Sequence, residues 1–173
     1  MVRKIYTIGH STKKIEDFIK ILKAYKIGIL VDIRTVPRSR HNPQFEGFRL
    51  EEFLNNEEIS YIHLQQLGGL RRPRKDSPNL EWKNTTFRGY ADHMETEEFK
   101  EGLEILKKIA SEHNTVMMCA EAVPWRCHRN LVSDTLKVEG WEVLHIMTEK
   151  ITNEHELTKF IKIEKGKITY PKK

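Results

Sequence analysis

Short apolar runs recur along this chain, and the segments between them carry apolar residues at a helical period. Residues 27–33 are nearly all apolar, as expected for a strand covered on both faces. Ile15, Phe18, Ile19 and Leu22 instead fall on one face of a helix. Runs of the first kind predict five strands, at residues 5–9, 27–33, 59–64, 115–119 and 142–147. Strands that alternate with helices favour parallel pairing.

Helices are predicted between the strands. Ser11 is placed as the cap of the first helix, and Thr96 as the cap of one that carries Phe99, Leu103 and Leu106. Further helices are predicted at residues 50–56, 87–94 and 130–139. The fold class is therefore α/β, a single domain over residues 1–173 with a mostly parallel central sheet of about five strands and helices on both faces.

Two segments depart from this alternation. Residues 65–95 form a loop-rich insertion, and long loops inside a compact domain are usually functional or mobile. Near the carboxyl end, Asn153 and Glu156 have the spacing of a capping box and predict one more helix. Alternating residues on either side of Lys165 and Gly166 then predict a β-hairpin over residues 161–170.

Charge distribution suggests a phosphate-bearing partner. The chain carries 30 Lys and Arg against 25 Asp and Glu, a formal net charge of +5. Its basic residues gather at 34–41, which includes Arg38 and Arg40, and at 71–75, which includes Arg71 and Arg72. Basic loops of this kind suit phosphate. The alternative is an ion-paired surface rich in Lys and Glu, without a partner.

No stretch is long enough to span a membrane, and the start of the chain is too short and too interrupted in its apolar part for a signal peptide. Two cysteines make no disulfide framework. The expectation is a cytoplasmic protein with reduced thiols and no membrane partner; the oligomeric state stays open.

The segment between Cys119 and Arg129 is the first candidate for chemistry, because it lies at a predicted strand-to-helix turn. Cys127 would lie just before a helix, where free amide hydrogens, the helix dipole and neighbouring Arg126, His128 and Arg129 would lower its pKa. Three interpretations stay open: a nucleophile with His128 as proton carrier, a metal ligand together with Cys119 and histidines such as His10, or a small buried apolar residue.

Polar residues follow several strands at the point where each strand ends, and ligands of open parallel sheets bind at that edge. The residues are His10 and Ser11, Asp32 and Arg34, His63 and Gln65, Cys119 and Glu121, and His145, Thr148 and Glu149. We expect them to meet at one edge of the sheet. Each also has a structural alternative, such as a buried ion pair for Asp32 or a loop hydrogen bond for His10.

Several motifs of known chemistry are missing from the sequence. It has no Gly-x-Gly-x-x-Gly turn, Walker-type loop, Gly-x-Ser-x-Gly elbow or His-Glu-x-x-His helix. We therefore predict no cofactor and no resident metal. An anion could still bind at the start of the helix after Cys127, next to Arg129.

Five motifs in order resemble the family called domain of unknown function 488. They are Tyr6-Thr-Ile-Gly-His-Ser11, Val31-Asp-Ile-Arg34 with Pro37 and Ser39-Arg40, Tyr61-Ile-His-Leu64 with Leu67-Gly-Gly69, Cys119-Ala-Glu121 with Pro124, and Cys127-His-Arg129. The resemblance spans about residues 5–147. It implies one α/β domain with these motifs gathered at one site, and no particular activity.

The sequence thus favours an enzyme, a hydrolase or transferase with a reactive cysteine, that acts on a nucleotide or nucleic acid. The predicted catalytic groups are Cys127, His128, Asp32, Glu121 and His10, and the predicted substrate-binding residues are Arg34, Arg38, Arg40, Arg129, Ser11, Gly68 and Gly69. Arg71 and Arg72 would add phosphate contacts. The alternatives are a non-catalytic nucleic-acid-binding module and a metal site built from Cys119, Cys127 and His10.

Overall fold

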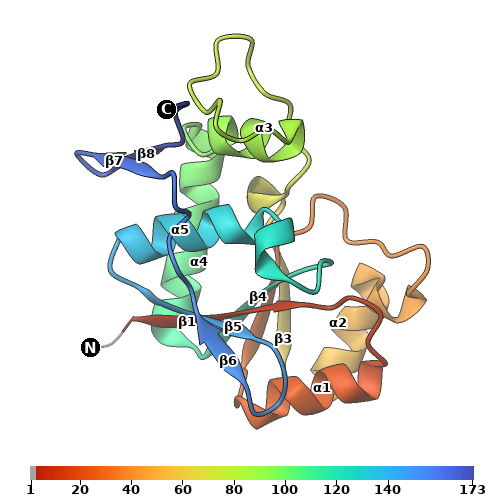
Figure 1. The fold of residues 1–173 in the computed structure, drawn as a ribbon. Helices are drawn as coiled ribbons and strands as arrows, with labels where there is room; N and C mark the ends of the chain where they lie inside the picture. Colours follow the sequence, from red (N-terminus) through yellow and green to blue (C-terminus); the bar gives the residue numbers. More distant parts are fainter. Residues whose placement is uncertain (1–2) are drawn as a thin grey trace.

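The computed structural model describes residues 3–173, and its centre is a six-stranded sheet (Figure 1). The strands follow the order β3-β2-β4-β1-β5-β6, and all neighbours pair in parallel except β5 and β6. The sheet strands are β1 (Lys4–Gly9), β2 (Ile29–Asp32), β3 (Ser60–His63), β4 (Thr115–Cys119), β5 (Glu142–Ile146) and β6 (Thr152–Glu154). The predicted α/β class and mostly parallel sheet are confirmed.

Helices cover both faces of the sheet, as predicted. They are α1 (Ile15–Ala24), α2 (Gly47–Asn55), α3 (Thr85–His93), α4 (Glu97–Glu112) and α5 (Arg129–Val138). Figure 1 shows α1 and α2 on one side of the sheet, with α3, α4 and α5 on the other. Successive side chains of a strand point to opposite faces of the sheet and so contribute to different hydrophobic cores. Ile5 packs toward α4 and α5, whereas Ile8 packs toward α1 and α2.

Two predicted caps have different outcomes. Thr96 caps α4, since its hydroxyl accepts a hydrogen bond from the Phe99 amide. Ser11 as a cap is wrong: the residue before α1 is Lys14, and Ser11 has a positive φ of 48°. Its amide donates instead to the Ala120 carbonyl at 2.9 Å, because this turn joins the end of β1 to the loop after β4.

The carboxyl-terminal segment was predicted in part. The hairpin is confirmed as β7 (Lys162–Glu164) and β8 (Lys167–Thr169), joined by Lys165 and Gly166, both with positive φ. The helix predicted from Asn153 and Glu156 is wrong, because Asn153 belongs to β6 and pairs with β5. A turn at Thr148, whose hydroxyl accepts from the Lys150 and Ile151 amides, directs the chain back along β5.

The insertion at residues 65–95 contains one turn of 3-10 helix, Gln65–Leu67, and α3. Asn84 begins α3 by accepting hydrogen bonds from the Thr86 and Phe87 amides. Two further 3-10 turns, Pro43–Phe45 and Pro124–Arg126, lie in the loops after β2 and β4. All three turns therefore lie in loops that follow the carboxyl ends of strands.

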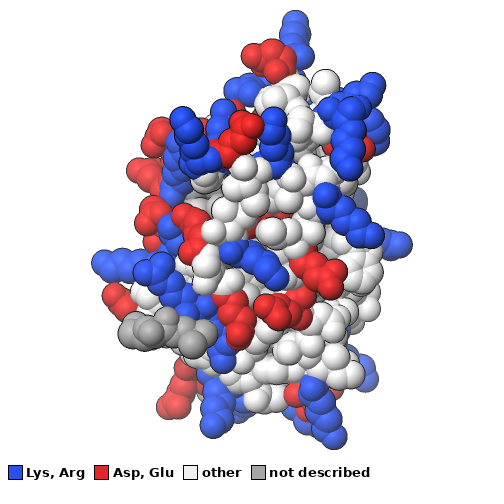
Figure 2. Space-filling view, turned by 60° about the vertical axis from the view of Figure 1, so that its left-hand side comes forward, with Lys and Arg blue, Asp and Glu red and all other residues white. Residues whose placement is uncertain are grey.

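The surface carries both signs of charge. On the face shown in Figure 2, Lys and Arg are interspersed with Asp and Glu instead of forming one basic field. Within residues 3–173, no helix has the length and apolar character needed to cross a membrane.

Gly9 is required where β1 meets the loop after β4. A methyl group at this position would overlap the Glu121 carbonyl, whereas one at Gly28 would only touch the Asn114 oxygen at 3.8 Å. We expect Gly9→Ala to lower the free energy of unfolding by about 2–4 kcal/mol, because this backbone must shift. Gly28→Ala, the matched control, should change it by less than about 1 kcal/mol. Urea unfolding measures both, and equal stability of the two variants would contradict the close approach.

Candidate functional site at the carboxyl edge of the sheet

The central strands β2, β4 and β1 end at one level, and a cavity opens beyond them. In register, Gly9 lies beside Cys119, and Asp32 lies beside Met118. The edge cavity has a volume of about 440 Å³. Its lining includes Cys119, Cys127, His128, Glu121, Gly69, Arg34, Arg38 and Arg126. The sheet therefore brings together residues of several of the predicted motifs.

Cys119 and Cys127, the cysteine pair, lie side by side at this edge. Their sulfurs are 2.6 Å apart, and both cysteines are free. Cys119 is 1 % exposed and Cys127 is 5 % exposed. Cys127 lies two residues before α5, as predicted, and its sulfur accepts the Arg129 amide hydrogen at 3.4 Å. The start of the helix thus contacts the sulfur directly.

The two thiols have opposite pKa shifts. Burial raises the pKa of Cys127 well above its ordinary value, and the neighbouring Cys119 sulfur raises it further. Burial also opposes ionisation of Cys119, but the Cys127 thiol that donates to its sulfur and the charge of Arg129 outweigh burial and lower its pKa. The lowered pKa predicted for Cys127 therefore falls on Cys119 instead, because the Cys127 thiol donates to the Cys119 sulfur and the two groups titrate as a pair.

His128 is held with an acceptor nitrogen toward Cys127. Its Nε2–H donates to the Ile33 carbonyl at 2.7 Å, which leaves Nδ1 as an acceptor 3.4 Å from the Cys127 sulfur. Burial lowers its pKa to about 4. The ring is therefore neutral near pH 7, with Nδ1 facing the Cys127 sulfur.

Asp32 and Arg34 form a buried ion pair under the cavity. Arg34 donates from Nη2 to Oδ2 at 2.7 Å and from Nε to Oδ1 at 3.0 Å, and the Tyr61 hydroxyl adds a bond to Oδ2 at 2.6 Å. His10 accepts from Arg34 Nη1 at 3.4 Å and donates through Nδ1 to the Ser11 carbonyl at 2.9 Å. Arg34 is thus fixed from two sides, and it is one of the residues that line the cavity.

Arg129 lies beneath the loop that connects the two cysteines. It is 1 % exposed and donates from Nη2 to the Glu121 and Ala122 carbonyls at 3.2 and 3.4 Å. Its Nε has no hydrogen-bond partner among residues 3–173. The guanidinium supports the loop and supplies positive charge to the cysteine pair, and it does not line the cavity.

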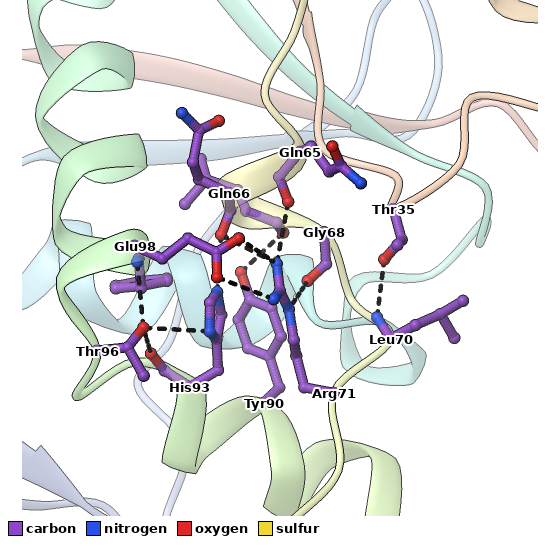
Figure 3. Close-up of polar contacts among 12 residues, drawn as sticks. Thr35, Gln65, Gln66, Gly68, Leu70, Arg71, Tyr90, His93, Thr96 and Glu98 are labelled. Atoms are coloured by element: carbon purple, nitrogen blue, oxygen red, sulfur yellow. Dashed lines mark hydrogen bonds and ion pairs between the residues drawn. The ribbon is translucent and has the colours of Figure 1, made fainter.

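The two-glycine motif lets the loop after β3 approach the site. A methyl group at Gly69 would overlap the His128 ring, and one at Gly68 would overlap Thr35. Arg71 holds this loop from the other side by donating to the Gln65 and Gly68 carbonyls at 3.0 and 3.1 Å (Figure 3). It also pairs with Glu98, so it is a structural arginine instead of a free phosphate ligand.

The remaining predicted residues fall in different places. Arg40 and Ser11 lie outside the residues that line the cavity, as does Gly68. Reasoning from the sequence did not select seven residues that do line it: Thr35, Val36, Leu70, Asn84, Thr86, Phe87 and Ala120. Four of these, Leu70, Asn84, Thr86 and Phe87, belong to the insertion at residues 65–95, and the length of that insertion was the signal that could have found them.

His145, predicted at the same edge, belongs to a separate buried chain of polar groups. The Thr7 hydroxyl contacts His145 at 2.6 Å, His145 contacts His155 at 2.9 Å, and His155 donates to Asp134 at 2.7 Å. Tyr170 donates to the same carboxylate at 2.8 Å. This chain attaches the carboxyl-terminal segment to α5 and β1.

Metal ligation was one alternative for the cysteines. Among residues 3–173, no three His, Cys, Asp or Glu side chains are grouped as metal ligands would be. Cys119, Cys127 and His10 therefore do not form such a group. His10 instead stacks on Phe45, with ring centroids 4.3 Å apart.

The fold and the site together define an α/β protein with a paired-cysteine cavity at the carboxyl edge of a parallel sheet. The family model described as "Domain of unknown function DUF488" matches residues 14–136, which is most of the chain, and the protein belongs to this family. The match contains the ion pair, the two-glycine loop and both cysteines, and it ends within α5. Comparisons with curated proteins and with solved structures returned no match.

The buried ion pair can be tested by mutation. Asp32→Asn leaves Arg34 buried without a counter-charge and should lower the free energy of unfolding by about 3–5 kcal/mol. Asp76 pairs with Arg74 at the surface, where its side chain is 86 % exposed. The control Asp76→Asn should therefore change stability by less than about 0.5 kcal/mol. Equal effects in chemical denaturation would show that the Asp32 pair contributes no more than a surface pair.

Stability should fall in mild acid because three histidines are buried and neutral. Burial lowers the pKa of His10 and His128 to about 4 and that of His145 to about 3, so the unfolded chain binds these protons first. Their contribution is complete above about pH 6.5 and is lost as the pH falls toward 4. Each histidine should add a slope of up to about 1.4 kcal/mol per pH unit. Urea unfolding from pH 7 to 4.5 measures this, and a flat profile would contradict it.

Proposed function

We propose that this protein is an enzyme, a hydrolase or transferase, that acts on a phosphate-bearing substrate in the edge cavity through its cysteine pair. The observation that carries the proposal is that both cysteines and three arginines line one cavity. Its volume, about 440 Å³, suits a small-molecule ligand such as a nucleotide, or the end of a nucleic acid strand.

Positive charge on the cavity wall supports an anionic substrate. Arg38 and Arg126 are exposed there, and Arg34 presents its guanidinium from a buried ion pair. Glu121 is the acidic residue in the lining. Guanidinium groups bind phosphate oxygens through paired hydrogen bonds, so these arginines would hold the phosphate next to the sulfurs.

The proposed chemistry uses Cys119 as a thiolate and Cys127 as the proton donor. The Cys119 thiolate attacks phosphorus, an S–P bond forms, and the ester P–O bond breaks as Cys127 gives its proton to the leaving oxygen. Water then attacks phosphorus and breaks the S–P bond, and its proton returns to Cys127. An alcohol in place of water makes the same cycle a phosphoryl transfer.

Other residues have supporting roles in this proposal. Asp32 and His10 position Arg34, since both side chains are occupied by contacts with that arginine. His128 positions Cys127, since its Nδ1 contacts the Cys127 sulfur at 3.4 Å. Glu121, exposed at the cavity, orients the attacking water, and Arg129 stabilises the thiolate from below.

A non-catalytic nucleic-acid-binding module is the second candidate. It would use the exposed Arg38, Arg126 and Trp125, which is 61 % exposed beside the cavity loop. It gives no role to two adjacent sulfurs, and one arginine of the second basic cluster, Arg71, is held by its own loop. These two observations favour the enzyme.

Phosphate release tests the enzyme directly. The substrates are p-nitrophenyl phosphate, a nucleoside monophosphate and a 5′-phosphorylated oligonucleotide. Cys119→Ser should lower kcat/KM by roughly 1000-fold or more, because the nucleophile is lost. Circular dichroism of the variant checks that the fold is retained. Turnover unchanged in Cys119→Ser would refute the role of the pair.

Arginine variants in the same assay separate the two candidates. Arg38 lines the cavity and Arg40, also exposed, does not, so Arg40→Gln is the matched control. Arg38→Gln should raise KM about 10-fold or more, with little change for Arg40→Gln. If the wild type releases no phosphate but binds the oligonucleotide with an affinity that falls with salt and is unchanged in Cys119→Ser, the binding module is correct.

A further inference from the structure

The cysteine pair has the arrangement needed for a second kind of chemistry, which requires no phosphate. The sulfurs are 2.6 Å apart, only about 0.5 Å beyond the ~2.05 Å length of a disulfide bond. Both cysteines line the edge cavity, so a small molecule has a route to sulfurs that are otherwise almost fully buried.

We propose that Cys119 and Cys127 are a peroxide-reactive dithiol, which a hydroperoxide converts into a reversible intramolecular disulfide. In the first step the Cys119 thiolate attacks the peroxide: an S–O bond forms, the O–O bond breaks, and the leaving oxygen takes a proton from solvent water to become water or an alcohol. In the second step the Cys127 sulfur attacks Cys119 sulfenic acid. The S–S bond forms, the S–O bond breaks, and hydroxide leaves with the Cys127 proton as water.

The environment gives each cysteine a separate role. Arg129 and the Cys127 thiol favour the thiolate of Cys119, which is the form that attacks peroxide. Cys127 keeps its proton at rest, because burial and the neighbouring Cys119 sulfur raise its pKa, and in the second step this proton passes to the leaving hydroxide. Cys127 is therefore the resolving cysteine, and its position beside Cys119 should capture the sulfenic acid before further oxidation.

The backbone between the cysteines can accommodate the bond. The two cysteines are eight positions apart, and the residues between them form a loop with one 3-10 turn, Pro124–Arg126. Ala120, Glu121 and Trp125 in this loop are exposed. Drawing the sulfurs together by about 0.5 Å therefore moves a surface loop, while β4 and α5 keep their positions.

The disulfide would also inactivate the proposed enzyme, because its formation removes both the Cys119 thiolate and the Cys127 proton. That consequence rests on the proposed function. The oxidation itself does not, since it involves only the two sulfurs and the peroxide.

The experiment treats the full-length protein with one equivalent of hydrogen peroxide at pH 7 and alkylates free thiols with iodoacetamide. Intact mass is then measured without reductant. We expect a loss of two hydrogens, no alkylation, a monomer on a non-reducing gel, and full recovery of both thiols with dithiothreitol. Peptide mapping of the wild type assigns the bond, so the result does not depend on a variant that folds.

Single variants test the assigned order. Cys127→Ser should accumulate the Cys119 sulfenic acid, trapped by dimedone, whereas Cys119→Ser should react with peroxide at least roughly tenfold more slowly than the wild type. Thiols that stay reduced in the wild type, irreversible oxidation in place of a disulfide, or equal rates in both variants would overturn the proposal. A disulfide that forms in a protein without phosphate release would leave this inference standing and refute the proposed function.

Discussion

Parallel pairing of β4 between β1 and β2 is the constraint on which the site depends. It places the end of β4, and with it Cys119, between the loops that follow the two neighbouring strands. Backbone bonds extend this alignment past the strands, because the His10 amide donates to the Cys119 carbonyl and the Ile33 amide to the Met118 carbonyl, each at 3.0 Å. His128 completes the connection through its bond to the Ile33 carbonyl. The same contacts that close the sheet edge therefore orient the groups that could react there.

Buried positive charge is the second requirement of this edge, and the chain meets it in two ways. Arg34 is neutralised by Asp32, so its burial is compensated and its guanidinium is held rigid at the cavity wall. Arg129 has no carboxylate partner and is compensated by two loop carbonyls and by the neighbouring sulfurs. A protein pays a desolvation penalty for such an arginine, and the penalty falls when a nearby thiol ionises. Arg129 thus links the stability of the loop to the charge on the cysteine pair.

The sequence predicts most of the architecture because the strands and helices carry clear periodicity. The prediction of helix caps at Ser11 and Asn153 is wrong. The backbone at both positions pairs with segments distant in the sequence, and a local sequence pattern contains no information about such contacts. For the site, the strand-end rule selects Asp32, Arg34, Cys119 and Glu121 correctly as neighbours of one edge. It cannot show that His10 is occupied by Arg34, or that Arg71 turns back onto its own loop. The order of the strands and the direction of long side chains are tertiary information.

The cysteine pair shows how tertiary information changes chemistry. A helix start favours ionisation of Cys127 when that residue is considered alone. With a second sulfur 2.6 Å away, the two groups no longer titrate independently, and their contact lowers the pKa of one thiol while it raises the pKa of the other. The lowered pKa belongs to the more deeply buried Cys119, because Cys127 donates to it and Arg129 lies near. With Cys119 ionised and Cys127 protonated, the site would contain a nucleophile and a proton source in contact. Phosphoryl transfer and peroxide reduction would both require the Cys119 thiolate and the Cys127 proton, so the two reactions would exclude each other.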